Sequence, residues 1–201
     1  FNNVFERPED LMFKKETSYN YELGLKASVL DYLFTEAALF YSMLENQQIY
    51  RVNPSGVGSY LDNSGLSRNK GFELSLSNSS FHGFEAAAAY GYTHAEILEY
   101  ELSENLNYNH KFTPYIPRHT LSLQANQTLP FPNSDWVDRL KFHVSYQQSG
   151  ELYWNLSNSL KEARFGMLNA KISWMKNNFQ VDFWGKNLTN TQHNAFIFEV
   201  S

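Results

Sequence analysis

The sequence predicts an all-β fold, built from the antiparallel up-and-down strands of a transmembrane β-barrel. Apolar and polar side chains alternate with a period of two along most of the chain, which is the periodicity of the two faces of a strand. The polar connections between these segments alternate between short and long. Short turns at one end and long loops at the other are typical of an outer-membrane barrel, whereas the Greek-key connections of a soluble sandwich mix both lengths.

Composition agrees with this class. The 201 residues carry a formal charge of −5, with 16% aromatic and 18% charged residues and no cysteine. A mildly acidic chain without a basic cluster is unlike a nucleic-acid-binding protein. The absence of cysteine excludes disulfides, thiolate zinc sites and a cysteine nucleophile. No apolar run reaches the roughly 18–20 residues that a membrane helix needs, and the segment that starts at Phe1 does not have the pattern of a signal peptide.

The clearest strand is predicted at Tyr19–Val29, where every odd position is apolar or aromatic and the positions between them are polar or small. A helix would scatter the same residues around its circumference. The same alternation predicts strands at 71–77, 84–93, 121–127, 140–147, 168–174 and 179–184. Gln127 and Trp184 break the alternation at the ends of two of them.

The segment Leu33–Gln48 is compatible with a strand or with a buried helix. We expect a strand, with Leu33 and Tyr41 on the apolar face and Glu36 on the polar face, although Phe34 and Phe40 then lie on the polar side. A further strand is expected to begin near Asn194, so the sequence predicts eight strands and the start of a ninth.

The predicted connections fall into two classes. Those expected to be short turns are Leu30–Tyr32, Asn78–Gly83, Phe131–Val137 and Lys176–Asn178. Those expected to be long loops are Arg51–Leu66, Glu96–Arg118 and Gly150–Arg164. With the short turns at the periplasmic side, Tyr19, Tyr92 and Trp154 lie near the outer rim and Trp174 near the inner rim, as in an interfacial aromatic girdle.

Several phrases resemble the C-terminal part of the barrel of TonB-dependent outer-membrane receptors of the iron-complex and siderophore type. They are ETSYNYELGLKAS (Glu16–Ser28), ALFYSMLENQQIY (Ala38–Tyr50), NSGLSRNKGFELSLS (Asn63–Ser77), YIPRHTLSL (Tyr115–Leu123) and WGKNLTN (Trp184–Asn190). Their order and spacing match along nearly the whole chain. His193 stands where the family commonly has an aromatic residue, and this departure weakens only the last of these motifs.

The resemblance implies that residues 1–201 are about the last third of a plugged barrel of 22 strands, without its final strand and without the N-terminal plug domain. It also implies an integral protein of the Gram-negative outer membrane that imports a ligand such as a ferric siderophore or haem with TonB-coupled energy. The implied partners are the chain's own plug, the TonB–ExbB–ExbD complex reached through the plug, membrane lipid and a small iron complex, with no nucleic acid. Two other functions stay open from the residues alone: a passive porin or adhesin barrel, and a soluble all-β carbohydrate-binding domain.

Ligand binding is expected in the long loops and the upper part of the lumen, where aromatic residues and arginines together suit a planar, anionic ligand. The candidate ligand-binding residues are Arg51, Tyr60, Arg68, Tyr108, Tyr115, Arg118 and Trp154. The loop histidines His94, His110 and His119 are the nearest approach to a metal site, but their spacing is not that of a ligand set, and solvated histidines are the expectation. We therefore predict no catalytic, metal or cofactor site, and no enzyme.

Overall fold

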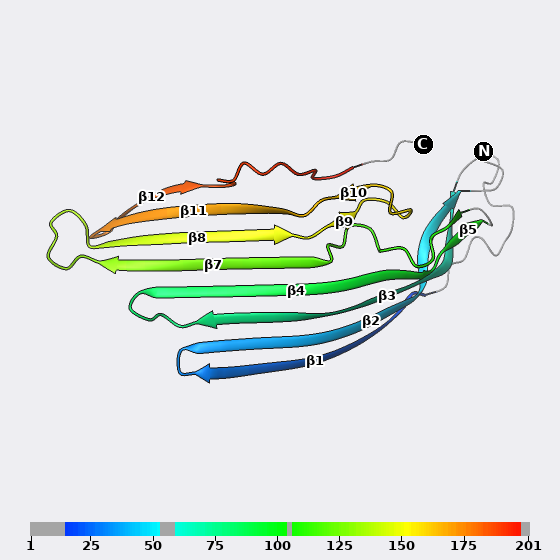
Figure 1. Cartoon of the computed structure of the whole chain (residues 1–201), viewed down its shortest axis with the longest axis horizontal. Coiled ribbons are helices and arrows are strands. Elements are labelled where there is room, and N and C mark those ends of the chain that lie inside the picture. The colour runs from blue at the N-terminus through cyan, green and yellow to red at the C-terminus, as the bar shows by residue number, and fades with distance from the viewer. Residues whose placement is uncertain (1–14, 53–58, 104–105, 198–201) are drawn as a thin grey trace.

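The computed structural model describes residues 15–52, 59–103 and 106–197. One antiparallel sheet of eight strands dominates the fold, in the order β1-β2-β3-β4-β7-β8-β11-β12 (Figure 1). These strands are β1 (Thr17–Leu30), β2 (Leu33–Val52), β3 (Ser59–Asn78), β4 (Phe84–Glu99), β7 (His119–Pro130), β8 (Arg139–Ser149), β11 (Phe165–Lys176) and β12 (Phe179–Gly185). All eight predicted strands are confirmed, including Leu33–Gln48, for which the helix alternative is wrong. No helix in the described ranges is long and apolar enough to cross a membrane.

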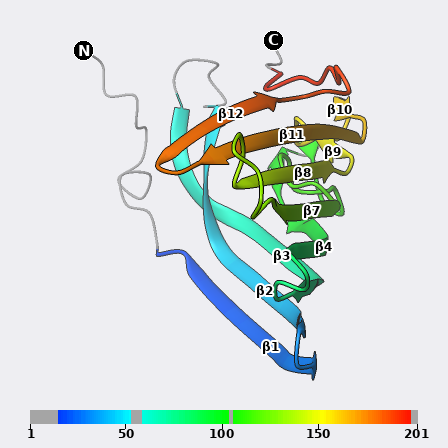
Figure 2. The same cartoon turned by 90° about the vertical axis from the view of Figure 1, so that its left-hand side faces the viewer.

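Each strand of the sheet pairs with its neighbour in the chain order of the main strands, which is up-and-down connectivity. The sheet is curved, and β1 and β12 lie on the same side of the middle strands (Figure 2). It is not closed, because β1 and β12 are the first and last strands in the sheet order. An open, curved, up-and-down sheet is the shape expected of a sector of a larger barrel.

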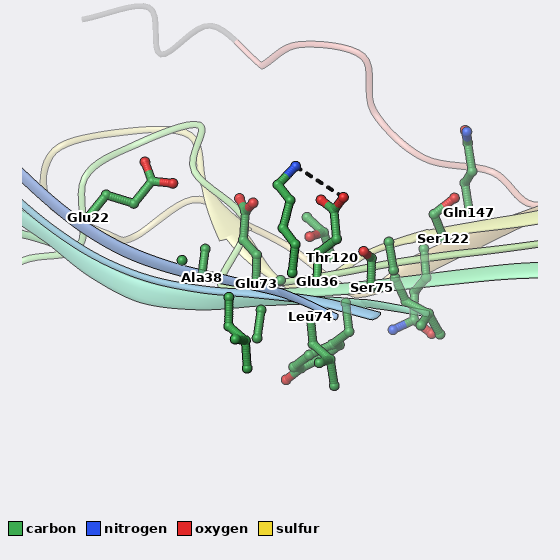
Figure 3. A pocket seen from close by; sticks show the side chains of 18 residues that line it. Glu22, Glu36, Ala38, Glu73, Leu74, Ser75, Thr120, Ser122 and Gln147 are labelled. Carbon is green, nitrogen blue, oxygen red and sulfur yellow. Dashed lines mark hydrogen bonds and ion pairs between the residues drawn. The ribbon is translucent and has the colours of Figure 1, made fainter. Parts of the chain in front are cut away.

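The two faces of the sheet differ in polarity. In Figure 3 the side chains of Glu22, Glu36 and Glu73 rise from one side of the sheet, and Leu74 lies on the other. We call the side of the glutamates the inner face, because the segment after β12 passes over it (Figure 3). The opposite, outer face exposes the alternating apolar residues, such as Leu23, which is 72% exposed. An apolar outer face with a polar inner face is the reverse of a soluble barrel and typical of a membrane barrel.

The short and the long connections lie at opposite ends of the sheet, as predicted, but one predicted long loop belongs to a hairpin. The turns at one end are short, and the chain segments at the other end between β4 and β7 and between β8 and β11 are long (Figure 1). These two long connections contain small hairpins, formed by β5 (Glu101–Ser103) with β6 (Leu106–Asn107) and by β9 (Leu152–Tyr153) with β10 (Lys161–Glu162).

The prediction of a long loop at Arg51–Leu66 is wrong. β2 and β3 continue to pair as far as Val52 and Ser59. The two strands stay paired through this polar sequence because bulges at Glu45–Gln48 accommodate residues that have no partner in the other strand. Asn46, within this bulged region, has a positive φ of 57°. Polarity therefore marks the part of this hairpin outside the apolar band, and it does not mark a loop.

The expected ninth strand near Asn194 is also corrected. Residues 186–197 form no strand in the structure, and 198–201 lie outside the described residues. Asn194 instead donates hydrogen bonds to Glu162, from its backbone N–H at 3.3 Å and its side-chain amide at 2.8 Å. This segment therefore crosses the inner face as irregular chain and is held there by loop contacts.

A glycine accounts for an aromatic residue on the polar face. Phe40 lies on the inner face of β2 directly opposite Gly71 of β3. A Cβ at Gly71 would lie 2.6 Å from Phe40 Cζ and would clash with the carbonyl oxygen of Tyr92. The phenylalanine ring thus covers a backbone that has no side chain, as aromatic residues do beside glycines in other sheets.

Gly71→Ala is accordingly expected to destabilise the protein by about 1–3 kcal/mol, since the added methyl group meets both a ring and fixed backbone. Gly24→Ala is the matched control, because the nearest atom to its Cβ is the Ala37 oxygen at 3.8 Å. That control is expected to be neutral or up to about 1 kcal/mol stabilising. Denaturant unfolding of both variants measures the difference, and equal effects of the two substitutions would contradict this account of Gly71.

Candidate functional site

The buried apolar residues gather where the strands meet the long connections. Among the described residues, the buried apolar ones are Ala95, Ile97, Tyr100 and Trp154. The buried polar residues Ser67 and Glu162 lie at the same end, and the buried Ser173 lies near the other end, in β11. A transmembrane strand needs about 9–11 residues, so the 16-residue β4 extends beyond the apolar band that ends with Tyr92. This end of the sheet is therefore the candidate site.

The register shows which face each candidate residue occupies. Phe72 is paired with Tyr92 on the outer face, with ring centroids 5.9 Å apart. Lys70 with His94, and Arg68 with Glu96, follow at steps of two residues, so they share that face. Ser67 and Ile97 are also paired with each other, but each lies one position away from Arg68 or Glu96 in its strand. Their side chains therefore point to the inner face.

The outer-face group is held together by Glu96. Its carboxylate accepts a hydrogen bond from Arg68 Nη2 at 2.8 Å and lies 3.0 Å from His110 Nδ1 and 3.4 Å from His94 Nε2. Backbone hydrogen bonds from His110 to Ile97 and from Ile97 to Lys111 run beside these contacts. The connection after β6 is thereby fastened to the end of β4.

Arg118 belongs to the same face. Phe112 forms a bridge with Glu96 and makes an edge contact with the His94 ring, so it lies on the outer face. The Arg118 guanidinium carbon is 4.7 Å from the Phe112 ring centroid, within the range of a cation–π contact. Arg118 Nη1 is 3.8 Å from Glu151, whose other oxygen is 2.7 Å from Lys161 Nζ.

The pKa of Glu96 falls from its ordinary 4.5 to about 2, because the hydrogen bond with His110 and then those with Arg68 and His94 favour the carboxylate over the opposing effect of burial. A lowered pKa stabilises the folded state at pH values above 4.5, and this contribution is lost as the pH falls through about 2. The carboxylate's contribution to the contact between β4 and the segment at His110 is therefore lost progressively between pH 4.5 and about 2.

We expect His110→Ala to raise the pKa of Glu96, because it removes the largest of the favourable interactions. Carboxyl-carbon NMR titration of the protein in detergent measures this change directly. His82→Ala, in the turn before β4, is the control and is expected to leave the Glu96 titration unchanged. An unchanged titration in His110→Ala would show that the histidine does not interact with this carboxylate in solution.

The inner face carries an aromatic concavity of about 520 Å³ at the same end, which we call the vestibule. Its lining combines strand residues with residues of the long connections and of the segment after β12. Tyr115 stacks on Phe196 with ring centroids 5.8 Å apart and planes 3° apart, and Trp154 meets both rings edge-on. Tyr108 packs edge-on against the buried Tyr100 at 5.6 Å.

A buried carboxylate supports this aromatic group. Glu162, 7% exposed, accepts hydrogen bonds from Asn194 and, at 3.3 Å, from the indole nitrogen of Trp154. These bonds, led by the Asn194 side chain, lower the pKa of Glu162 against the effect of burial. Trp154 is thus oriented by Glu162, and the buried carboxylate is hydrogen-bonded at the edge of the indole ring.

A second concavity, of about 570 Å³, lies further along the inner face (Figure 3). Lys26 and Glu36 form an ion pair of 3.1 Å there, and Glu22, Glu73 and Gln147 project into the same space (Figure 3). A polar wall of this kind suits contact with a protein domain or with water inside a barrel. Among the described residues, no group of three His, Cys, Asp or Glu side chains is placed to hold a metal ion.

The predicted ligand-binding residues therefore divide between the two faces. Tyr108, Tyr115 and Trp154 line the vestibule, whereas Arg68 and Arg118 lie on the outer face. Arg51 and Tyr60 face each other across the β2–β3 hairpin, and their side chains lie outside the described residues. In the described part of the chain, Arg68 and Arg118 therefore do not line the same concavity as these three aromatic residues, and ligand binding by this set stays a prediction.

The sequence does not predict Phe196 or Glu162 as part of the site, because no local pattern distinguishes them from other loop residues. Phe196 follows the last strand of the sheet, and Glu162 lies in a two-residue strand. Of the three loop histidines, His94 and His110 approach Glu96, while His119 Nδ1 lies 2.7 Å from the Tyr90 hydroxyl. Cross-strand register, which local patterns do not contain, decides these partnerships.

The chain is similar to known proteins in both sequence and structure. A family model described as "TonB dependent receptor-like, beta-barrel" matches residues 2–188. In solved structures, the chain is similar to the ferric yersiniabactin uptake receptor FyuA from Yersinia pestis, with a TM-score of 0.77, 18% identity, and coverage of 94% of this chain and 27% of that chain.

Two further structures are similar in the same way. They are the siderophore receptor PiuA from Acinetobacter baumannii, with a TM-score of 0.73, 20% identity and coverage of 92% and 26%, and the ferric-catecholate import receptor Fiu from K12 E. coli, with a TM-score of 0.66, 22% identity and coverage of 92% and 25%. The chain thus spans about a quarter of the length of these proteins. At these identities the similarity establishes the fold.

Proposed function

The chain belongs to the TonB-dependent receptor-like β-barrel family, and on that basis we propose that it forms part of the wall of an outer-membrane receptor that imports a small ligand with TonB-coupled energy. The observation that carries the proposal is the division of the sheet into an apolar outer face and a polar inner face with an aromatic vestibule at the long-loop end. A passive porin would have no need of that vestibule, and a soluble domain would not expose the apolar face.

We further propose that residues 1–201 lie within a closed barrel completed by other strands and filled by a plug domain. The open edges at β1 and β12 support this, since unpaired edges within a bilayer leave backbone groups without hydrogen bonds. The polar inner face near Glu73 and the Lys26–Glu36 pair then faces the plug. The plug, in turn, is the part that engages the TonB–ExbB–ExbD complex. Membrane lipid contacts the outer face, and the protein resides in the outer membrane of a Gram-negative bacterium.

The ligand class that we propose is a ferric siderophore. The three similar structures are named for yersiniabactin, catecholate and siderophore uptake. Tyr108, Tyr115 and Trp154 offer ring faces and edges to such a ligand on the wall of the vestibule. The role is binding and transport, without catalysis, and no cofactor takes part in it.

Uptake of radioactive iron tests the proposal. The complete receptor that contains this chain is produced in a Gram-negative host without other siderophore receptors, and cells receive iron bound to a catecholate, a hydroxamate or a thiazoline siderophore. We expect uptake of at least one complex, abolished when TonB is deleted. Uptake that persists without TonB would identify a passive channel, and the absence of uptake for all iron complexes would reject the ligand class.

A further inference from the structure

We propose that Tyr115 and Trp154 form a subsite for an aryl ring of the imported iron complex, and that Phe196 occupies this subsite until the ligand displaces it. The inference rests on the proposed function and deepens it, because it names the class of iron complex as one whose chelating groups carry aromatic rings. Phe196 is then an internal competitor of the ligand, and the strength of its ring contacts limits how tightly such a complex binds.

Two walls of the subsite are held in place by contacts that do not involve Phe196. The backbone N–H of Tyr115 donates a hydrogen bond to the Tyr153 oxygen at 2.8 Å, and the indole of Trp154 donates one to Glu162 at 3.3 Å. The Tyr115 and Trp154 rings meet edge-on, with centroids 5.7 Å apart and planes at 73°. A corner of two such rings is preorganised for a third ring, which can stack on one and meet the other edge to face.

Phe196 supplies that third ring. Its plane is within 3° of the Tyr115 ring at a centroid distance of 5.8 Å, and it lies at 72° to the Trp154 ring at 6.2 Å. These are the offset-stacked and edge-to-face arrangements that aromatic pairs prefer. Phe196 is nevertheless 49% exposed and lines the vestibule of about 520 Å³. A ligand in the vestibule can therefore reach the ring, which is not buried as a core side chain would be.

The segment after β12 is anchored just before Phe196. The Thr191 hydroxyl donates a hydrogen bond to the Gly166 carbonyl oxygen at 2.6 Å, and the His193 ring stacks on Phe165 with centroids 4.2 Å apart and planes 9° apart. The two hydrogen bonds from the next residue to the buried carboxylate of the vestibule complete this anchor. Phe196 follows these contacts in the chain, so its ring can leave the subsite while the segment stays attached.

An aryl group of the ligand would exchange one set of ring contacts for another. It offers Tyr115 a face to stack on and Trp154 a ring to meet edge-on, whereas an alkyl group offers neither. The cost of displacing Phe196 lowers the apparent affinity of any complex that enters the subsite, as an unfavourable conformational equilibrium does. Removal of the Phe196 ring therefore favours aryl complexes selectively, because an alkyl complex gains little from the vacated corner.

The test uses two gallium(III) complexes that share charge and donor atoms. The tris-benzohydroxamate complex carries a phenyl ring on each chelator, and the tris-acetohydroxamate complex carries a methyl group instead. Calorimetric titration of the complete receptor in detergent gives the affinity for each complex in the wild type, Phe196→Ala and Phe179→Ala. Phe179, 73% exposed at the start of β12, is the matched control. Because gallium(III) is diamagnetic, para-fluorophenylalanine in place of Phe196 reports the position of the ring by fluorine NMR.

We expect Phe196→Ala to bind the benzohydroxamate complex about two- to tenfold more tightly, the range of one aromatic pair, and to leave binding of the acetohydroxamate complex unchanged. Phe179→Ala should change neither affinity. The fluorine resonance should carry a ring-current shift that is lost when the benzohydroxamate complex is added. Equal changes for the two complexes in Phe196→Ala, weaker binding of the benzohydroxamate complex, or a resonance that this complex does not move would overturn the proposal.

Iron uptake measured on the same receptor separates failure of this inference from failure of the proposed function. A receptor that imports iron, but whose Phe196→Ala variant shows no gain for the benzohydroxamate complex, keeps the proposed function and loses this inference. A receptor that imports no iron complex and binds neither gallium complex loses both.

Discussion

Trp154→Ala is expected to open the outer end of the structure locally. Trp154 is 8% exposed, contacts Tyr115 and Phe196, and donates a hydrogen bond to the buried Glu162. Removing the indole leaves a cavity and a buried carboxylate with one donor fewer. Large-to-small substitutions of this kind cost about 3–5 kcal/mol, so exchange of the backbone amides of the β9–β10 hairpin should accelerate about 100-fold or more.

Hydrogen exchange read by mass spectrometry measures this effect. Trp136→Ala is the matched control, because Trp136 is 82% exposed in the short turn between β7 and β8. A surface substitution of this type changes stability by less than about 0.5 kcal/mol. If both tryptophan variants exchange at the wild-type rate, the aromatic group around Trp154 does not hold the vestibule together.

Ala88→Arg is expected to destabilise the membrane-inserted protein by about 2–4 kcal/mol, the cost of an arginine on the lipid-facing side of a barrel near the bilayer midplane. Ala88 is central in the apolar band of β4 and faces Leu76 and Leu123 on the neighbouring strands. Equilibrium unfolding in urea, with the complete receptor folded into lipid vesicles, gives the free energy of unfolding.

The adjacent residue provides the control. Ala89 is paired with Ser75 and Ser122, whose side chains rise from the inner face (Figure 3). Ala89→Arg therefore places the same side chain on the same strand in a polar space, and we expect a loss below about 1 kcal/mol. Equal losses for the two variants would mean that the two faces of the sheet do not meet lipid and lumen as assigned here.

Much of the architecture could be predicted from local patterns. The alternation at Tyr19–Val29 predicts a strand because each side chain in a sheet has only two directions, and a membrane barrel sorts them into lipid and lumen. The same reasoning resolves Leu33–Gln48 as part of β2. What it could not explain was Phe40 on the polar face, since the reason is Gly71, which lies 31 positions later and becomes its neighbour only in the β2–β3 pair.

The candidate site was less predictable. In the sequence, Arg68 and Arg118 fall near the ends of predicted strands, and Tyr115 and Trp154 fall in predicted long loops, so the sequence predicts them close together around one ligand. The structure places the arginines and the two aromatic residues on different faces. Arg68 follows the regular alternation of Phe72 and Lys70 to the outer face, whereas the faces of Arg118, Tyr115 and Trp154, which lie outside the regular strands, depend on the path of the connections. Arg118 turns toward Phe112, although the alternation of β7, in which Thr120 points to the inner face, would place it on the inner side.

The amino-acid sequence alone determined the class of fold, the number of main strands, the apolar face of each strand and the two ends of the sheet. These properties follow from the chemistry of consecutive residues, whose side chains alternate across a strand wherever that strand pairs. Tertiary structure decided how far β2 and β3 extend, which side chains meet around Glu96 and Glu162, and that the vestibule and the residues around Glu96 occupy opposite faces. Such contacts join residues from distant parts of the chain, and their geometry is set by register and bulges, which no local pattern contains.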